Sequence, residues 1–279
     1  MRILVIGGNG FVGSYLMKYF SCDGTSKNGG NGLYPLDVIN KEQIREILSK
    51  LSPEIVINAS GLTNVDYCET HLEEAFLING TCVKDIADMT ESLGSVFFHF
   101  SSDYVFDGND GNYIETAPTN PLNTYGRSKL LAESLLKDSK CVILRISTPY
   151  GRNFSGNKKT FFDFITSNLS SGIPIRIVDD QYSTPTYIGE IPKAITSLYE
   201  NNQSGIFNLG SINCMSRFDF SVEVANVFSL PSGLIKRVSS SEVGFKARRP
   251  SNTCMNSSKI SKFITIKKVH DNLIDMITS

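Results

Sequence analysis

Four short apolar runs divide the first half of the chain. They occupy residues 3–7, 54–60, 96–102 and 141–147, and they are rich in isoleucine, valine, leucine and phenylalanine. Apolar runs of this length, without alternating polar residues, are typical of strands buried on both faces of a sheet. We therefore predict four buried β-strands.

Helical patterns lie between these runs. Residues 41–51 repeat apolar positions at helical spacing, behind a capping-box signal of Asn40 with Gln43. Residues 71–92 predict a longer helix, which Gly94 ends. Strands that alternate with helices form right-handed crossovers and a parallel sheet covered on both faces. The predicted fold class is therefore α/β, a Rossmann-type doubly wound parallel sheet.

The pattern changes after the fourth predicted strand, where Ser, Asn, Gly and Pro become frequent. We predict a Rossmann domain over residues 1–149 and mainly a smaller C-terminal lobe over residues 150–279. A strand and a helix near 173–200 are expected to return to the main sheet. Residues 150–172 and 204–279 are expected to form the lobe over one rim of that sheet.

One rim of the predicted sheet collects polar and small residues. Gly7, Ser60, Ser102 and Ser147 each stand at the carboxyl end of a predicted strand. In doubly wound folds, ligands bind beyond these carboxyl ends. We therefore expect the functional site at this rim.

A glycine-rich turn follows the first predicted strand. Residues 8–13, GNGFVG, fit the pattern G-x-G-x-x-G, and Gly7, Gly10 and Gly13 fit an overlapping G-x-x-G-x-x-G. Such a turn exposes backbone N–H groups at the positive end of a helix, where a pyrophosphate can bind. We predict dinucleotide binding, with a tight structural turn as the alternative, by Gly7, Gly10, Phe11, Val12 and Gly13.

The next segment bears on the choice of dinucleotide. An acidic residue about twenty positions after the turn usually binds the adenosine ribose of NAD. Residues 21–33 contain no convincing second strand with an acid at its end, because Asp23 comes too early. Ser26 and Lys27 could meet a 2′-phosphate instead, although Lys27 also fits a solvated surface loop. The predicted cofactor is NADPH, with NADH as the alternative.

Tyr125 and Lys129 lie four residues apart in a helix predicted to begin near residue 123, so they share one helical face. A lysine charge in this position lowers the pKa of the phenol toward the pH at which tyrosine transfers protons. Pairs with this spacing are more often ordinary surface pairs. Ser102, at the end of the third run, adds a hydroxyl that could hydrogen-bond a reacting carbonyl at the same rim.

Stretches along nearly the whole chain resemble the extended short-chain dehydrogenase/reductases, and within them the dTDP-4-dehydrorhamnose reductase family. They are, in order, GGNGFVG, INASGLTNVDYCE, HFSSDYVFDG, NPLNTYGRSKLLAE, LRIS-x-x-YG, DQYSTPT and ARRPSNTCMNSSK. The resemblance implies an NAD(P)H-dependent enzyme that reduces a 4-keto-6-deoxy sugar nucleotide, dTDP-4-dehydrorhamnose to dTDP-L-rhamnose. It implies a catalytic triad of Ser102, Tyr125 and Lys129.

The resemblance also implies how the ligands are held, with the C-terminal lobe binding the substrate. The additional cofactor residues that it implies are Asp37 and Val38 at the adenine, together with Ala59, Ser60, Gly61, Tyr125 and Lys129. The substrate residues that it implies are Thr63, Asp66, Tyr104 and Arg249, and an arginine suits a diphosphate by bidentate pairing. A solvated basic turn is the alternative for Arg249, and Gln181, Thr184 and Thr186 have only the family pattern behind them.

The chain departs from the family pattern at two site positions. Ser102 stands where the family commonly has threonine, which keeps the hydroxyl. Thr148 stands where the family often has tryptophan, and the chain contains no tryptophan at all. Because an aromatic ring there could stack against a sugar, its loss leaves the exact sugar nucleotide open.

Two other functions stay open for a chain with these motifs. A sugar-nucleotide epimerase of the same superfamily keeps the Tyr/Lys pair. The regulatory subunit of methionine adenosyltransferase shares similar stretches while acting as a non-catalytic, NADP-binding partner. Turnover with a keto sugar separates the enzyme from the regulatory subunit.

Composition and charge exclude several classes of function. With 41% hydrophobic and 20% charged residues, a net charge of −1 and no basic stripe, the chain lacks the electrostatic footprint of a nucleic-acid-binding protein. The first apolar run is too short for a signal peptide or a membrane span. The expected location is therefore cytoplasmic, without a membrane partner, and the resemblance suggests a homodimer.

The cysteines and histidines indicate neither a disulfide framework nor a metal site. The six cysteines have no C-x-x-C spacing and are spread over the whole length, which favours separate reduced thiols. The three histidines, His71, His99 and His270, have no acid or cysteine at ligand spacing around them. We predict no bound metal.

Overall fold

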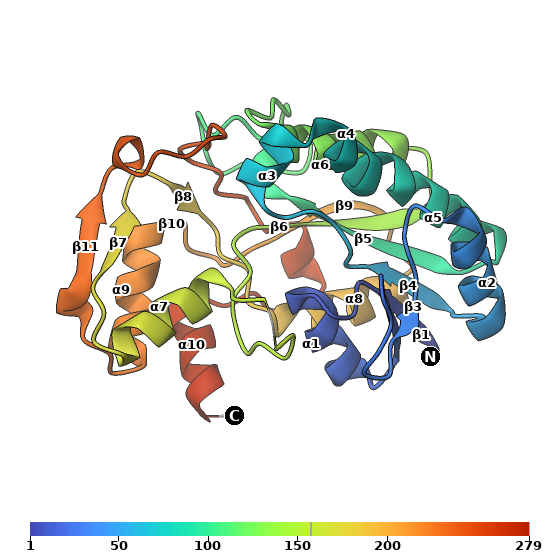
Figure 1. Cartoon of the computed structure of the whole chain (residues 1–279), viewed down its shortest axis with the longest axis horizontal. Coiled ribbons are helices and arrows are strands. Elements are labelled where there is room, and N and C mark those ends of the chain that lie inside the picture. The colour runs from blue at the N-terminus through green and yellow to red at the C-terminus, as the bar shows by residue number, and fades with distance from the viewer. Residues whose placement is uncertain (157, 279) are drawn as a thin grey trace.

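The computed structural model describes residues 1–156 and 158–278. Its centre is a seven-stranded sheet in which all neighbouring strands run parallel (Figure 1). In spatial order the strands are β3 (Tyr34–Pro35), β2 (Asp23–Ser26), β1 (Ile3–Ile6), β4 (Ile55–Asn58), β5 (Val96–Ser102), β6 (Cys141–Ile146) and β9 (Gly205–Leu209). The predicted doubly wound sheet is confirmed, and so are its four predicted strands.

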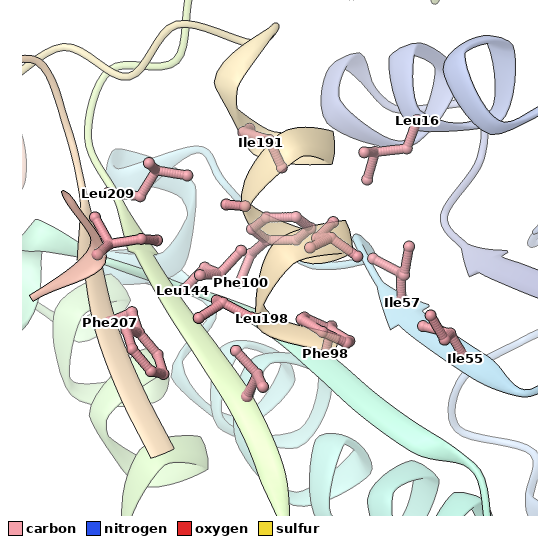
Figure 2. Packing of buried hydrophobic residues seen from close by; sticks show 14 of the residues in the cluster. Leu16, Ile55, Ile57, Phe98, Phe100, Leu144, Ile191, Leu198, Phe207 and Leu209 are labelled. Carbon is pink, nitrogen blue, oxygen red and sulfur yellow. The ribbon is translucent and has the colours of Figure 1, made fainter. Parts of the chain in front are cut away.

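Different helices cover the two faces of the sheet, because successive side chains of a strand point to opposite sides. The face that carries Val5 packs against α1 (Phe11–Phe20) and α8 (Glu190–Glu200), and Figure 2 shows Leu16 and Ile191 on that side. The face that carries Leu4 packs against α2 (Lys41–Leu51), α5 (Cys82–Ser92) and α6 (Thr124–Leu135). The parallel sheet is therefore buried on both sides, as its apolar strands require.

The helix predicted over residues 41–51 is confirmed as α2. The Asn40 side chain accepts hydrogen bonds from the backbone N–H groups of Glu42 and Gln43. Gln43 does not complete the predicted capping box, because its Oε1 accepts from the backbone N–H of Asp37 at 2.9 Å instead. The capping residue was thus predictable, and its reciprocal partner was not.

The single helix predicted over residues 71–92 is a run of three elements, preceded by a short helix. They are α3 (Val65–Thr70), α4 (Leu72–Phe76), the π-helical turn η1 (Leu77–Thr81) and α5. η1 packs closely on α6, since a Cβ on Gly80 would lie 2.6 Å from Cδ2 of Leu131. π-helical turns are rare and frequently mark functional sites.

A second hydrophobic core lies beyond the carboxyl ends of the main strands, on the left of Figure 1. Strands β7 (Ile175–Val178) and β11 (Ile235–Val238) pair in parallel, and β8 (Tyr182–Ser183) pairs antiparallel with β10 (Met215–Ser216). The helices of this core are α7 (Phe161–Ser170), α9 (Arg217–Val227) and α10 (Val269–Thr278). Four 3-10 turns complete the described elements: η2 (Asp103–Val105), η3 (Ser232–Leu234), η4 (Ser240–Glu242) and η5 (Ile260–Lys262).

The strand expected to return to the main sheet near residues 173–200 does not do so. β7 pairs with β11, because Ile175 and Ile177 pack into the second core. The helix of that unit, α8, does cover the main sheet. The strand that joins β6 is β9, inside the segment that we assigned to the lobe, and its Phe207 and Leu209 pack under α8 (Figure 2).

We predicted no convincing second strand with an acid at its end in residues 21–33, and the structure corrects the first part of this prediction, because β2 pairs with β1 there. Its sequence, DGTS, is small and polar, so apolar periodicity could not find it. Gly24 allows the close approach, since a Cβ at this position would overlap the Met17 side chain. Asp23 begins β2 and Ser26 ends it, so the end of the strand indeed carries no acid.

The prediction of six separate thiols is wrong for two of them, because Cys214 and Cys254 form a disulfide. Cys214 precedes β10, which pairs with β8, and the backbone N–H of Thr253 donates to the carbonyl oxygen of Tyr182 in β8. β8 thus brings the two cysteines together, and the spacing of the cysteines along the chain does not reveal this contact. The free cysteines are Cys22, Cys68, Cys82 and Cys141.

Candidate active site

A cavity of about 340 Å³ opens at the carboxyl ends of β1, β4, β5 and β6, where the site was predicted. We call it the inner cavity. Its lining includes Gly10, Phe11, Val12, Ala59, Ser60, Gly61, Ser102, Tyr104, Tyr125, Lys129 and Thr148. The three residues of the predicted triad therefore lie around one space, together with much of the predicted cofactor set.

The glycine turn shapes one wall of the inner cavity. Gly7 has a φ of 85°, which favours glycine, and a Cβ on Gly13 would overlap the Gly7 carbonyl oxygen. Gly10 caps α1 without a side-chain hydrogen bond, so the first N–H groups of the helix are free for a ligand. Gly7 and Gly13 do not line the cavity themselves; they allow Gly10, Phe11 and Val12 to do so.

The loop after β4 lines the inner cavity next to the glycine turn, beside the lysine. Asn79 in η1 holds this loop, because its Oδ1 accepts from the backbone N–H of Leu62 at 2.8 Å and its Nδ2 donates to Ser128 Oγ at 3.0 Å. Gly61 has a φ of 151°, and a Cβ there would lie 3.3 Å from Lys129 Nζ. The π-helical turn therefore holds the backbone of Gly61 close to the Lys129 ammonium.

Lys129 is only 4% exposed, and its Nζ donates to the backbone carbonyl oxygen of Phe100 at 3.0 Å. Burial lowers its pKa to about 8. No carboxylate pairs with Lys129 among the residues that the structure describes. The ammonium is therefore close to titration at neutral pH and has donors left for a ligand.

Tyr125 and Ser102 lie close together in the inner cavity. Burial raises the pKa of Tyr125, while a side-chain hydrogen bond with Ser102 acts in the opposite direction. Asp103 acts in the same direction as burial, and the lowering of this pKa that we expected from Lys129 is not seen in the structure. A raised pKa keeps Tyr125 protonated at neutral pH, as a proton donor must be.

The start of α6 is pressed against the loop after β5. The Asn123 side chain caps the helix by accepting from the backbone N–H of Gly126 at 2.9 Å and donates to the Arg248 carbonyl oxygen at 2.8 Å. A Cβ on Gly126 would overlap the backbone carbonyl oxygen of Tyr104. This close packing sets where Tyr125 stands relative to Ser102.

Asp103 joins three segments beneath the cavity. Its carboxylate accepts hydrogen bonds from the hydroxyls of Ser102 at 3.0 Å, of Ser147 at 2.7 Å and of Thr253. Burial raises the pKa of Asp103, and these hydroxyls act against the shift. Asp103 therefore positions Ser102 and ties the rim of the sheet to the C-terminal lobe.

A second cavity of about 400 Å³ adjoins the first, and we call it the outer cavity. Thr63 and Tyr104 line both cavities, whereas Arg249 lines the outer one only. Asp66 lines neither; it pairs with Arg249 at 3.0 Å and accepts from the backbone N–H of Ala247 at 3.0 Å. Of the four predicted substrate residues, Thr63, Tyr104 and Arg249 line the cavities, and Asp66 holds Arg249 in place.

The predicted adenine residues lie farther out. Asp37 and Val38 follow β3 at the edge of the sheet and do not line the inner cavity. Lys27, which is 71% exposed, pairs with Asp37 at 3.0 Å. Although partial burial acts to raise the pKa of Asp37, the hydrogen bonds from Lys27 and from the Ile39 backbone lower it below its usual value.

The sequence analysis missed several residues that line the inner cavity, among them Lys158, Phe161 and Arg217. Lys158 Nζ donates to Thr63 Oγ1 at 2.9 Å. Arg217 is the first residue of α9, and a capping signal could have placed it, because Ser216 Oγ accepts from the backbone N–H of Asp219 at 3.0 Å. Nothing in the sequence indicated that this helix would start at the cavity.

No group of three or more His, Cys, Asp and Glu side chains in residues 1–156 and 158–278 could hold a metal ion. Within the same residues, every helix is too short or too polar to cross a membrane.

Comparison with known proteins places this geometry in a family. The family model described as "RmlD substrate binding domain" matches residues 1–278. The probable low-salt glycan biosynthesis reductase Agl14 of Haloferax volcanii is 30% identical, over 93% of this chain and 91% of its own. The dTDP-4-dehydrorhamnose reductase of Aggregatibacter actinomycetemcomitans is 29% identical, over 95% and 94%.

Similarity in structure and a regulatory relative extend the comparison. A crystal structure from Sulfolobus tokodaii, described as a hypothetical dTDP-4-dehydrorhamnose reductase, has a TM-score of 0.87 and 30% identity, over 98% of this chain and 99% of that one. The methionine adenosyltransferase 2 subunit beta of Danio rerio is 25% identical, over 93% of this chain and 84% of its own. Because the family model spans almost the whole sequence, this chain belongs to the RmlD substrate binding domain family.

Proposed function

We propose that this chain reduces the keto group of a 4-keto-6-deoxy sugar nucleotide with a nicotinamide cofactor, converting dTDP-4-dehydrorhamnose to dTDP-L-rhamnose. One observation carries the proposal: Ser102, Tyr125 and Lys129 lie around the inner cavity together with the open start of α1. Reductases among the relatives support the same reaction.

The residues present fit a dinucleotide. The free N–H groups at the start of α1 suit a pyrophosphate, and the glycine at position 61 leaves room beside Lys129 that a Cβ would fill. Lys129 would hold the nicotinamide ribose, and Ala59 and Ser60 would line the same wall. The cofactor would supply the hydride that adds to the ketone carbon.

The side chains of the chain supply the rest of the reduction. Ser102 would donate a hydrogen bond to the ketone oxygen and so orient the carbonyl. Tyr125, protonated at neutral pH, would deliver the proton that the new alkoxide needs. Thr63, Tyr104 and Arg249 would contact the sugar nucleotide, with Arg249 held in place by Asp66.

NADPH is the cofactor that we propose. The end of β2 offers Ser26 and Lys27 and no carboxylate for a ribose hydroxyl. Lys27 pairs with Asp37 at 3.0 Å, and an exposed ion pair of this kind contributes little free energy. A comparison of the dissociation constants of NADPH and NADH by fluorescence titration tests the preference, and tighter binding of NADH would reverse it.

A second candidate function has one observation in its favour. The similarity to a methionine adenosyltransferase subunit is compatible with a regulatory protein that binds the cofactor without turnover. The two functions differ in a single assay, the oxidation of NADPH in the presence of dTDP-4-dehydrorhamnose, followed by identification of the sugar product.

We expect substrate-dependent oxidation and a dTDP-L-rhamnose product. Binding of NADPH without any turnover would reject the reductase and favour the regulatory function. Light scattering on the same preparation tests the homodimer that the family resemblance suggests.

A further inference from the structure

Three polar side chains that line the outer cavity have donors without a partner in the described part of the chain. They are the guanidinium of Arg217, Nε2 of Gln181 and Nη1 of Arg249. Arg217 pairs with no described carboxylate and only lies over the ring of Phe161, at 5.1 Å. Nε2 of Gln181 and Nη1 of Arg249 are buried, whereas Arg217 is half-buried. Buried donors without partners are rare and costly in folded proteins, so these two donors, with Arg217 beside them, point to a ligand.

Arg217 and Gln181 are held at neighbouring points of the backbone. The backbone N–H of Arg217 donates to the Gln181 carbonyl oxygen at 3.1 Å, next to the pairing of Ser216 with Tyr182. Gln181 is only 7% exposed, and its Nε2 is buried against the cavity. The backbone contact therefore places the two side chains at the same part of the outer cavity, where burial also fixes the Gln181 side chain.

The charge of the outer cavity rests mainly on Arg217. Arg249 is neutralised by Asp66 at 3.0 Å, and Arg176 pairs with Glu242 at 3.2 Å. The acid that faces Arg217 is Asp103, and three hydroxyls already use the oxygens of its carboxylate. Arg217 is thus the cation with the most capacity left for an anionic ligand.

The position of Arg217 indicates which part of a ligand it meets. Arg217 and Tyr104 line both the inner and the outer cavity, so they stand where the two spaces join. If the reacting sugar occupies the inner cavity beside Tyr125, the group at this junction is the linker between sugar and nucleoside. In a sugar nucleotide that linker is a diphosphate, which arginine and amide donors bind well.

We propose that Arg217, with Gln181 beside it, binds the diphosphate of the sugar nucleotide, and that Arg249 adds its free Nη1 to the same site. This inference rests on the proposed function, since it takes a sugar nucleotide as the substrate. It moves the main charge contact from Arg249, which the sequence pattern favours, to a residue that no motif identified.

The test measures binding without turnover, by calorimetry with dTDP and with thymidine. Arg217→Gln should weaken dTDP binding by about 10- to 100-fold, the usual effect of losing a charge-assisted hydrogen bond, and leave thymidine binding unchanged. Gln181→Leu should weaken dTDP binding by a smaller factor. Arg237→Gln is the matched control, because Arg237 is exposed, pairs with Asp179 and lines neither cavity.

Each other result would overturn the inference in a recognisable way. Wild-type affinity for dTDP in Arg217→Gln, with an unchanged melting temperature, means that the cation does not bind the diphosphate. A raised KM for the complete sugar nucleotide with unchanged dTDP binding means that Arg217 contacts the sugar instead. If the wild-type protein binds no dTDP at all, the proposed function falls together with this inference.

Discussion

Removing the hydroxyl of Tyr125 should lower the rate of the reaction without changing the affinity for NADPH. Tyr125→Phe keeps the ring and its edge contact with Tyr104, so folding and NADPH binding should be unchanged. The kcat should fall by about 10²- to 10⁴-fold, the usual contribution of a positioned general acid. Steady-state NADPH oxidation and a fluorescence titration of NADPH measure the two effects.

Tyr67→Phe provides the matched control for that change. The Tyr67 hydroxyl donates to Glu74 on the surface of the protein, outside the inner cavity, so its loss should leave kcat unaltered. Wild-type turnover by Tyr125→Phe would remove this residue from the mechanism.

Lys129 should make cofactor binding depend on pH. Its pKa is about 8 in the folded protein, against 10.5 for an unperturbed lysine, so the charge is lost as pH rises through about 8. We expect the Kd for NADPH to increase from pH 7 to pH 9 in the wild type. Lys129→Met should bind weakly at both values, and an equal pH dependence in this variant would assign the titration to another group.

The same pKa has a defined sign for stability. Between about pH 8 and 10.5 the unfolded chain keeps a proton at Lys129 that the folded chain has released, so raising the pH in this window favours folding. Below about pH 8, burial of the charged Lys129 therefore lowers the free energy of unfolding by its full amount. Lys129 is a residue that lowers the stability of the fold while serving the site.

At the scale of elements, the packing of α6 against η2 decides the distance between the proton donor and Ser102. Gly126→Ala adds a Cβ that would overlap the Tyr104 carbonyl oxygen and would lie 2.9 Å from Pro121 Cβ. The start of α6 must move away, and a displacement of about 1 Å can cost on the order of 10²-fold in rate. We expect kcat to fall by at least about tenfold.

Gly233→Ala is the control for this helix prediction. Gly233 lies in η3, a Cβ there would meet nothing within 4 Å, and its φ is not in the left-handed region. Its kcat and melting temperature should match the wild type. An active Gly126→Ala would show that the contact between α6 and η2 does not position Tyr125.

At the scale of the whole molecule, the disulfide between Cys214 and Cys254 connects the segment before α9 to the segment that carries Thr253 and Arg249. The denatured protein should take up four alkyl groups before reduction and six after it, because four of the six cysteines are free. Six groups before reduction would contradict the bond. Mass spectrometry after alkylation measures the count.

The disulfide should also contribute to stability. It spans 40 residues, and loop-closure entropy assigns about 4 kcal/mol to a loop of that size. The Cys214→Ser, Cys254→Ser double variant should therefore melt at a lower temperature than the wild type. Cys22→Ser, which removes a free thiol, is the control and should melt close to the wild type.

Local sequence determined the parts of this protein that depend on neighbouring residues. Apolar runs of five to seven residues predicted buried strands, because runs this short and this rich in β-branched and aromatic residues suit a strand covered on both faces. The glycine turn and the spacing of Tyr125 and Lys129 are likewise local, and their positions at the rim follow from the parallel order of the strands. The family motifs added the roles of these residues.

Tertiary structure alone decided what depends on distant segments. β2 has no apolar pattern, and it is a strand because β1 pairs with it and Gly24 fits against Met17. β7 belongs to the small lobe and not to the main sheet, because α7 and α9 bury the isoleucines of β7. Cys214 meets Cys254, and Arg217 reaches the junction of the cavities, only because β10 pairs with β8. Such contacts join residues tens of positions apart, and their energies come from packing that no local pattern records.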